Sequence, residues 1–248
     1  MAQTLPPPVR PSESGVHAGR PYLLWLPAGH PRPWPGMVIV HGAGSRKENH
    51  GDFGRACAAA GWAALAYDQG GHGDSEDEMT PRALADAAAM ARFLGDRPDV
   101  DARRVCIRGS SLGGFIAIHT AATSEAIAGV VAICPSDEQH LLRGLREDTL
   151  HFRAGPQARA DLEAWLGEHD LREAVTLLGE RPLLLVHADG DERIPVESSR
   201  ELHRRATTPV KKLIVLPGGH HRSAQHDPEL QGIALRWLAR SLTGARTG

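Results

Sequence analysis

Short apolar runs alternate along this chain with helix-length segments, and this alternation is the feature that most narrows the folds open to it. The runs are rich in Val, Ile and Leu, and unbroken runs of this length are typical of strands buried on both faces. They span residues 22–26, 37–41, 63–67, 104–108, 129–133, 183–187 and 212–216, with helix-length segments at 82–94, 112–122 and 228–242. The pattern predicts an α/β fold with a mostly parallel central sheet and helices on both faces.

The length of 248 residues fits one large α/β domain, which we expect to run from residue 21 to residue 248. The first 20 residues carry four prolines among Ser, Glu and Gly, a mixture that opposes regular structure and predicts a flexible N-terminal arm. Residues 136–180 interrupt the alternation with charged, helical sequence and no clear strand. We expect this insertion to form a small helical cap over the edge of the sheet.

Charge and cysteine content exclude several classes of function. The 28 basic and 30 acidic residues are spread along the chain, so no broad field favours nucleic acid or an anionic membrane, and we expect a small-molecule substrate. The three cysteines, Cys57, Cys106 and Cys134, are unlike a disulfide framework or a metal site, and no metal or other cofactor is expected. The N-terminal sequence lacks the apolar core of a signal peptide, and no run approaches the roughly 20 apolar residues of a membrane span. A cytoplasmic location is therefore expected.

The sequence GSSLG at residues 109–113 has the pattern G-x-S-x-G and lies between a predicted strand and a predicted helix. A serine on a sharp turn from strand to helix needs small residues two positions before and after it, because the backbone crowds there. Glycines meet this need for Ser111, whereas Ser110 has Arg108 two positions before it. We predict that Ser111 is a nucleophile and that the N–H group of Leu112, at the start of the helix, faces a developing oxyanion.

A serine hydroxyl needs a base to remove its proton, and the base needs an acceptor that holds it in the correct tautomer. The apolar run at 183–187 leads into a loop with two carboxylates, Asp189 and Asp191. The next run leads to the imidazoles of His220 and His221. The order Ser, Asp, His is the one expected of the α/β-hydrolase arrangement. Local chemistry leaves the choice within each pair open.

The run at 37–41 continues as His41-Gly42-Ala43-Gly44-Ser45, where the glycines let a backbone N–H group approach a ligand closely. We predict that Ala43 N–H is the second oxyanion donor. For His41 we expect a structural role, as a brace of this loop through hydrogen bonds.

These residues together resemble the α/β-hydrolase superfamily over roughly residues 20–240. Within the superfamily the chain is most similar to the small esterases and peptidases grouped with dienelactone hydrolase and the serine aminopeptidases. The likeness lies in HGAGS at 41–45, YDQGGHGDS at 67–75, GSSLGG at 109–114, HADGDERIP at 187–195 and LPGGHH at 216–221.

The resemblance implies an esterase that forms an acyl-enzyme on Ser111. Its motif H-G-x-x-D-x-x-V-P selects Asp191, four residues beyond His187, as the orienting acid, and G-x-x-H selects His221 as the base. The activity it implies is hydrolysis of a small carboxylic ester by a serine carboxylesterase. Dienelactone hydrolases use a cysteine as nucleophile, which argues against their reaction here. A second departure is Gly70, which stands where arginine is common and leaves the anchoring of its loop in doubt.

Other interpretations of the same residues stay open. The triad also fits thioester, peptide or carbon–carbon bond hydrolysis, and the choice depends on a pocket shaped by the cap. A non-catalytic ligand-binding protein can keep the fold, although its signature would be the loss of a triad member. His72, Asp74 and Ser75 look like a site, but we expect them to form a structural loop. The histidines at 220, 221 and 226 do not show a recognised metal-ligand spacing.

Overall fold

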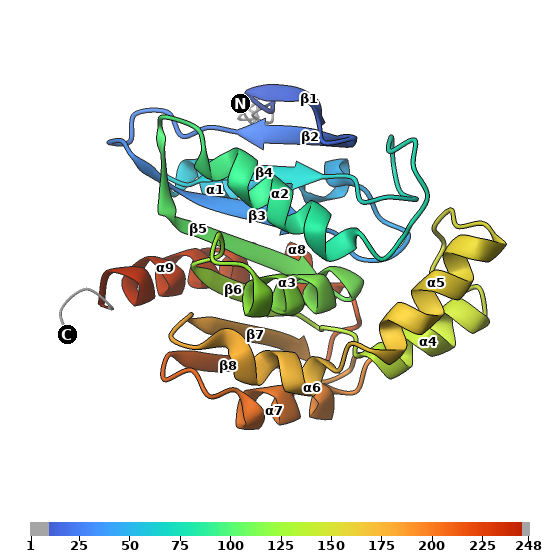
Figure 1. Cartoon of the computed structure of the whole chain (residues 1–248). Coiled ribbons are helices and arrows are strands. Elements are labelled where there is room, and N and C mark those ends of the chain that lie inside the picture. The colour runs from blue at the N-terminus through green and yellow to red at the C-terminus, as the bar shows by residue number, and fades with distance from the viewer. Residues whose placement is uncertain (1–9, 245–248) are drawn as a thin grey trace, which may run out of the picture.

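A single mixed sheet forms the centre of the molecule, and the computed structural model describes residues 10–244 of the chain. Eight strands of this range lie in the order β1-β2-β4-β3-β5-β6-β7-β8 (Figure 1). β2 pairs antiparallel with β1 and with β4, and all the other pairings are parallel. The strands are β1 (Glu13–His17), β2 (Arg20–Trp25), β3 (Trp34–Val40), β4 (Ala63–Tyr67), β5 (Val100–Ser110), β6 (Gly129–Ile133), β7 (Leu183–Ala188) and β8 (Lys211–Leu216).

Helices cover both faces of this sheet, which confirms the predicted fold class. In Figure 1, α2, α3, α6 and α7 lie in front of the sheet, α1 and α9 lie behind it, and α4 and α5 project past the carboxyl ends of the parallel strands. No helix within residues 10–244 has the length and apolar character needed to cross a bilayer. The helices are η1 (Lys47–His50), α1 (Gly51–Ala59), α2 (Ala83–Gly95), α3 (Leu112–Thr123), α4 (Glu138–Arg146), α5 (Pro156–Gly167), α6 (Leu171–Ala174), η2 (Val175–Leu178), α7 (Val196–Arg205), α8 (Ser223–His226) and α9 (Pro228–Gly244).

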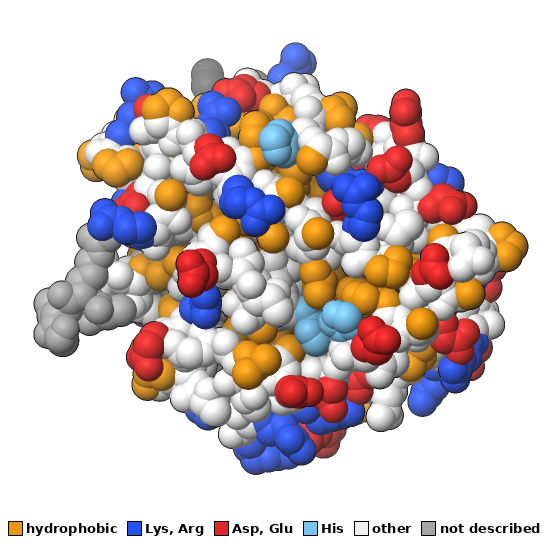
Figure 2. All heavy atoms as spheres, in the orientation of Figure 1, with side chains coloured by type: hydrophobic (Ala, Val, Ile, Leu, Met, Phe, Trp, Pro, Cys, Tyr) orange, Lys and Arg blue, Asp and Glu red, His pale blue; other side chains and the backbone are white. Residues whose placement is uncertain are grey.

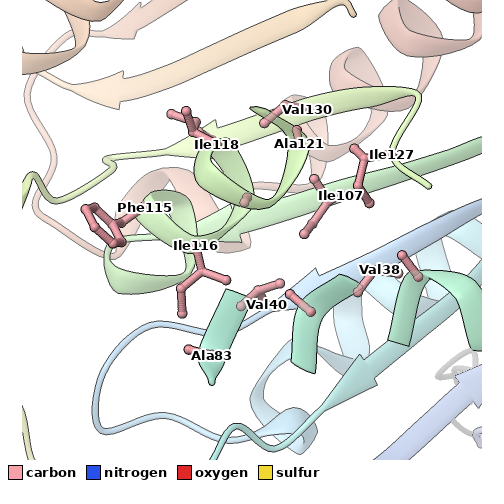
Figure 3. Packing of buried hydrophobic residues seen from close by; sticks show 14 of the residues in the cluster. Val38, Val40, Ala83, Ile107, Phe115, Ile116, Ile118, Ala121, Ile127 and Val130 are labelled. Carbon is pink, nitrogen blue, oxygen red and sulfur yellow. The ribbon is translucent and has the colours of Figure 1, made fainter. Parts of the chain in front are cut away.

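The central strands are buried on both faces, which explains their unbroken apolar runs. On β3, Val38 and Val40 belong to the core beneath α2 and α3, whereas Met37 and Ile39 belong to the core beneath α1 and α9. Figure 3 shows side chains of α3, including Ile116, packed with those of β3. Ile107 of β5 belongs to the same core, so this packing holds both the strand and the helix that flank the GSSLG turn in fixed positions.

The structure corrects the arm expected over residues 1–20. Glu13–His17 forms β1, which pairs with β2 through a tight turn at Ala18 and Gly19, both with positive φ. None of the residues of this edge strand is fully buried, so the strand has no apolar pattern that sequence reasoning can detect. Residues 1–9 of the expected arm lie outside the described residues.

The segment 136–180, in which a cap is expected, divides into two parts. Its first two helices, α4 and α5, pack on each other and stand beyond the ends of the parallel strands (Figure 1). Its last two, α6 and η2, pack on α3 and so belong to the front helical layer. The loop between α4 and α5 is tied to the main domain, because Arg153 N donates to Gly71 O and Met79 N donates to Arg153 O, at 2.9 and 2.8 Å.

Candidate active site

The turn between β5 and α3 holds Ser111 in a strained backbone conformation, with φ 54° and ψ −120°. Such a conformation costs of the order of 1–3 kcal/mol for a residue with a side chain and persists only where the surroundings enforce it. Two glycines make the turn possible: a Cβ at Gly109 would overlap Gly113 O, and one at Gly113 would overlap Val40 O. Ser111 N donates to Ile133 O at 3.0 Å, which ties the turn to β6.

The Ser111 hydroxyl faces a pocket of about 940 Å³ that His221 also lines. Its hydrogen-bond partner is Ser136, with the two Oγ atoms 3.2 Å apart, and the hydrogen bonds of residues 10–244 include none between Ser111 and His221. Ser136 follows β6, is buried, and its N–H donates to Ser111 O at 3.2 Å. Sequence reasoning missed Ser136, and its only signal was a position just after a predicted strand, at the edge where active loops gather.

The structure pairs Asp191 with His221. His221 Nδ1 lies 2.7 Å from Asp191 Oδ2, which leaves the other ring nitrogen available to the pocket. Asp189 instead accepts a hydrogen bond from the backbone of Gly218. The His220 ring accepts from Arg222 N at 3.2 Å. The structure therefore brings together Asp191 and His221, the two residues that the family motifs select over Asp189 and His220.

Four donors surround the Asp191 carboxylate, whose side chain has no exposed surface. Oδ1 accepts from Arg193 N at 2.8 Å and from Ile194 N at 2.9 Å, while His187 Nε2 lies 3.4 Å from Oδ2. Burial by itself would raise the pKa of Asp191, but the hydrogen bonds from His187, His221 and the two amides outweigh it and hold the pKa well below its usual range. The residue is thus an anion at neutral pH, as an acceptor for an imidazole N–H must be.

Two backbone amides near Ser111 are free to donate. Among the hydrogen bonds of the described range, neither Ala43 N nor Leu112 N has an acceptor. The loop of Ala43 approaches the turn closely, since a Cβ on Gly42 would lie 3.3 Å from Ser111 Cβ. Both predicted oxyanion donors are therefore unpaired among the described residues. Leu112 follows Ser111 directly in the chain, and Ala43 belongs to the loop that packs against the serine.

Solved hydrolase structures share this fold. The 2,6-dihydroxy-pseudo-oxynicotine hydrolase superposes with a TM-score of 0.76 at 19% identity, over 97% of this chain and 70% of that one. Est1E from Butyrivibrio proteoclasticus, solved with ferulic acid, superposes with a TM-score of 0.75 at 21% identity, over 94% and 100% of the two chains. The chain has the α/β-hydrolase fold. A model of the family described as serine aminopeptidase, S33, matches residues 32–141 of the chain.

Curated relatives of this chain are distant. An uncharacterised protein of Mycobacterium tuberculosis is 25% identical over 198 residues, which are 79% of this chain and 64% of the relative. The quorum-quenching protein AidA of Acinetobacter baumannii is 36% identical over 112 residues, which are 41% of this chain and 35% of that protein. The chain thus spans less than two thirds of the length of either relative.

His41 braces the loop before Ala43. Its side chain is buried, Nδ1 lies 2.8 Å from Gly42 O, and Nε2 accepts from Gln69 N at 3.2 Å. Burial lowers the pKa of His41 to about 4, with a smaller effect from His72. A neutral imidazole in this position matches the structural role expected for it.

The loop after β4 is anchored by an arginine from elsewhere in the chain. A Cβ on Gly70 would overlap Glu78 O, so the position has no room for a side chain. Arg20 of β2 lies beside it, donates to Ser75 Oγ at 2.7 Å and forms an ion pair with Asp77 at 2.6 Å. The resemblance places an arginine at position 70, where this chain has glycine. Arg20 of the edge hairpin supplies the guanidinium group in its place.

The neighbouring residues of that loop also have structural partners. His72 Nδ1 lies 2.9 Å from Gly70 O, and Asp74 Oδ2 accepts a hydrogen bond from the Lys47 ammonium at 2.5 Å. These contacts fit the structural role expected for His72, Asp74 and Ser75.

Cys134 lies beside the acid–base pair. Its Sγ, a carboxylate oxygen of Asp191 and a ring nitrogen of His221 all lie within 4.8 Å of one another. Metal binding needs the thiolate form of cysteine. Burial is the main effect that raises the pKa of the Cys134 thiol to about 12, so at neutral pH the thiol keeps its proton and is a poor ligand and a poor nucleophile.

Proposed function

We propose that the chain is a serine hydrolase that cleaves small carboxylic esters through an acyl-enzyme on Ser111. The observation that carries the proposal is the shared pocket: Ser111 on its strained turn and the imidazole of the Asp191–His221 pair line the same cavity. Its volume of about 940 Å³ lies within the usual range of small-molecule sites. Est1E and a soluble variant of yeast monoglyceride lipase, solved with a substrate analogue, share the fold.

The proposed first step is acylation. His221 Nε2 takes the proton of Ser111 Oγ as Oγ attacks the ester carbonyl carbon, and the carbonyl oxygen becomes an oxyanion. Ala43 N–H and Leu112 N–H donate to that oxyanion. As the intermediate collapses, the carbon–oxygen bond to the alcohol breaks, and the alcohol leaves with the proton from His221.

The second step is the mirror of the first. His221 takes a proton from water, the hydroxide attacks the acyl carbon, and Ser111 Oγ leaves with that proton, which releases the carboxylic acid. Ser111 Oγ lies 3.2 Å from Ser136 Oγ, and at the start of each cycle the proton of Ser111 has to point to His221 and not to Ser136.

Labelling with a fluorophosphonate, read by intact mass, tests the proposal. We expect one adduct on the wild type, mapped to Ser111 and absent from Ser111→Ala. Ser110→Ala is the matched control, because Ser110 is a buried serine one position away and its hydroxyl has no hydrogen-bond partner among the described residues. It should label and turn over short aryl esters as the wild type does, whereas Ser111→Ala should lose turnover by up to roughly a millionfold.

Parallel assays on an ester, a thioester and an aminoacyl amide of the same acyl chain distinguish the reactions that this triad can perform. The match to the serine aminopeptidase family model makes the amide the second candidate substrate. Turnover of the amide at a higher kcat/KM than the ester would replace esterase by peptidase as the proposed activity. Binding of a ligand without any adduct or turnover, by protein that is folded, would leave a ligand-binding role.

A further inference from the structure

We propose that the substrate of this site is an anionic ester, whose carboxylate or other anionic group is bound by Arg143, Arg193 and Arg222. The inference rests on the proposed function, because it places the charged group of the substrate in the same pocket as Ser111. It adds a substrate class that neither the triad nor the family resemblance specifies.

The charge of the pocket is unlike that of the protein. The chain as a whole carries a formal charge of −2, and Figure 2 shows acidic and basic side chains interspersed over one face of the molecule. The residues that line the pocket include three arginines, whereas Glu147 is their only carboxylate among the described residues. A concave site with an excess of one sign of charge concentrates ligands of the opposite sign.

The arginines of the pocket lack close carboxylate partners. Within residues 10–244 Arg143 and Arg222 form no ion pair, and Arg193 has only Glu192 at 3.7 Å, with both side chains 58% exposed. Arg146 stands three residues after Arg143 on α4, pairs with Glu163 at 2.7 Å and does not line this pocket. On one helix, therefore, the arginine that does not line the site is paired, and the one that lines it has no ion-pair partner among the described residues.

The three arginines come from three separate segments of the pocket lining. Arg193 and Arg222 lie next to the acid–base pair in the sequence, and their amides are held by Asp191 Oδ1 at 2.8 Å and by the His220 ring at 3.2 Å. Arg143 comes from α4, which projects past the carboxyl ends of the strands. An anionic group bound among them would lie in the pocket that holds the reacting carbonyl, and Arg is suited to bidentate contacts with a carboxylate.

The same charges argue against a cationic substrate. A peptidase that recognises a free amino terminus needs an anionic group to receive the ammonium, and the carboxylate of Asp191 is buried and occupied by its own donors. Glu147 alone faces three arginines in the lining. An α-ammonium group would meet repulsion, whereas a carboxylate would meet attraction.

Two aryl esters of equal chain length test the proposal: the hexanoate, which is neutral, and the monoester of adipic acid, which ends in a carboxylate. We expect the wild type to prefer the anionic ester by about tenfold or more in kcat/KM, since each exposed charge pair adds a factor of up to about five. The preference should shrink with added salt. In the triple variant Arg143→Gln, Arg193→Gln, Arg222→Gln this preference should vanish, and Arg146→Gln should keep the preference of the wild type.

Each outcome has a distinct meaning. Equal turnover of the two esters by the wild type, or a preference that survives the triple variant, would overturn the anionic substrate class and leave the esterase proposal intact. Hydrolysis of neither ester, with no fluorophosphonate adduct on Ser111, would overturn the esterase proposal itself. Calorimetric binding of adipate to Ser111→Ala, lost in the same protein with the three arginine substitutions, supports the anion site without any turnover.

Discussion

Replacement of Asp191 by Asn is the most informative change in the candidate site, because it keeps the shape of the side chain and reverses one hydrogen bond. The amide oxygen can take the place of Oδ1 and still accept from Arg193 N and Ile194 N. The amide –NH2 then stands where Oδ2 accepts from His221, and two donors face each other. His221 avoids this clash by moving its proton to Nε2, the nitrogen that has to accept the proton of Ser111.

We expect this tautomer change to lower kcat for a short aryl ester by about 10⁴-fold, the scale of the same change in a serine-protease triad. Stability should fall as well, because charge-assisted hydrogen bonds to a carboxylate contribute about 1.5–3 kcal/mol each, and in Asn they become bonds to a neutral amide, with the one to His221 reversed. A loss of roughly 2–4 kcal/mol in the free energy of unfolding follows for a side chain with no exposed surface.

The assay is the rate of fluorophosphonate labelling and of ester turnover, measured beside urea unfolding. Asp189→Asn is the matched control, since Asp189 belongs to the same loop but only accepts from the backbone of Gly218. It should keep turnover within a few-fold of wild type. Turnover of Asp191→Asn within tenfold of wild type, or inactivation by Asp189→Asn alone, would refute the reasoning.

Three further changes test other parts of the structure. Gly109→Ala should prevent folding or cost several kcal/mol, seen as loss of cooperative urea unfolding, because the new Cβ would overlap Gly113 O; a folded, active variant would contradict the account of the turn. Ser136→Ala should alter kcat by less than about tenfold and leave the labelled residue unchanged, since it removes one neutral hydrogen bond at 3.2 Å. Burial lowers the pKa of His119 to about 4, so the unfolded chain binds more protons below pH 6.5 and stability should fall by roughly 2–3 kcal/mol as pH drops from 6.5 to 4. His119→Gln should flatten that loss in urea titrations, and an unchanged pH dependence would assign it to other groups.

The layered fold could be predicted from the sequence because the central strands are buried on both faces. β4 and β6 coincide with two of the predicted runs, and all five residues of each are buried. Strands that are less buried have a weaker apolar pattern in the sequence, and β1 has none. Helix α7 was missed for a similar reason: most of the residues in VESSRELHRR are polar or charged, and only Val196, Ser199 and Leu202 are buried.

The candidate site was predictable where a motif restricts geometry. Ser111 could be chosen over Ser110 because only one of them has glycines two positions away on both sides. The choice of Asp191 over Asp189 needed the family motif, because both carboxylates follow the same strand and their partners depend on a turn that the residues do not specify locally. The roles of Ser136 and of the arginines of the pocket depend on side chains brought together by the fold, and no spacing in the chain reveals them.

The arginine that anchors the loop after β4 has a consequence for building hybrid proteins from this superfamily. In this chain the anchor belongs to the edge hairpin, as Arg20, and the loop itself has glycine at position 70. A chimera that joins this loop to a hairpin without such an arginine would have no anchor. The reverse exchange, with an arginine-bearing loop behind this hairpin, would force two cations into one site. Because the loop also pairs with Arg153 between α4 and α5, either mismatch would reach the segment that borders the pocket. Hairpin, loop and the α4–α5 connection should therefore be exchanged between relatives as one unit.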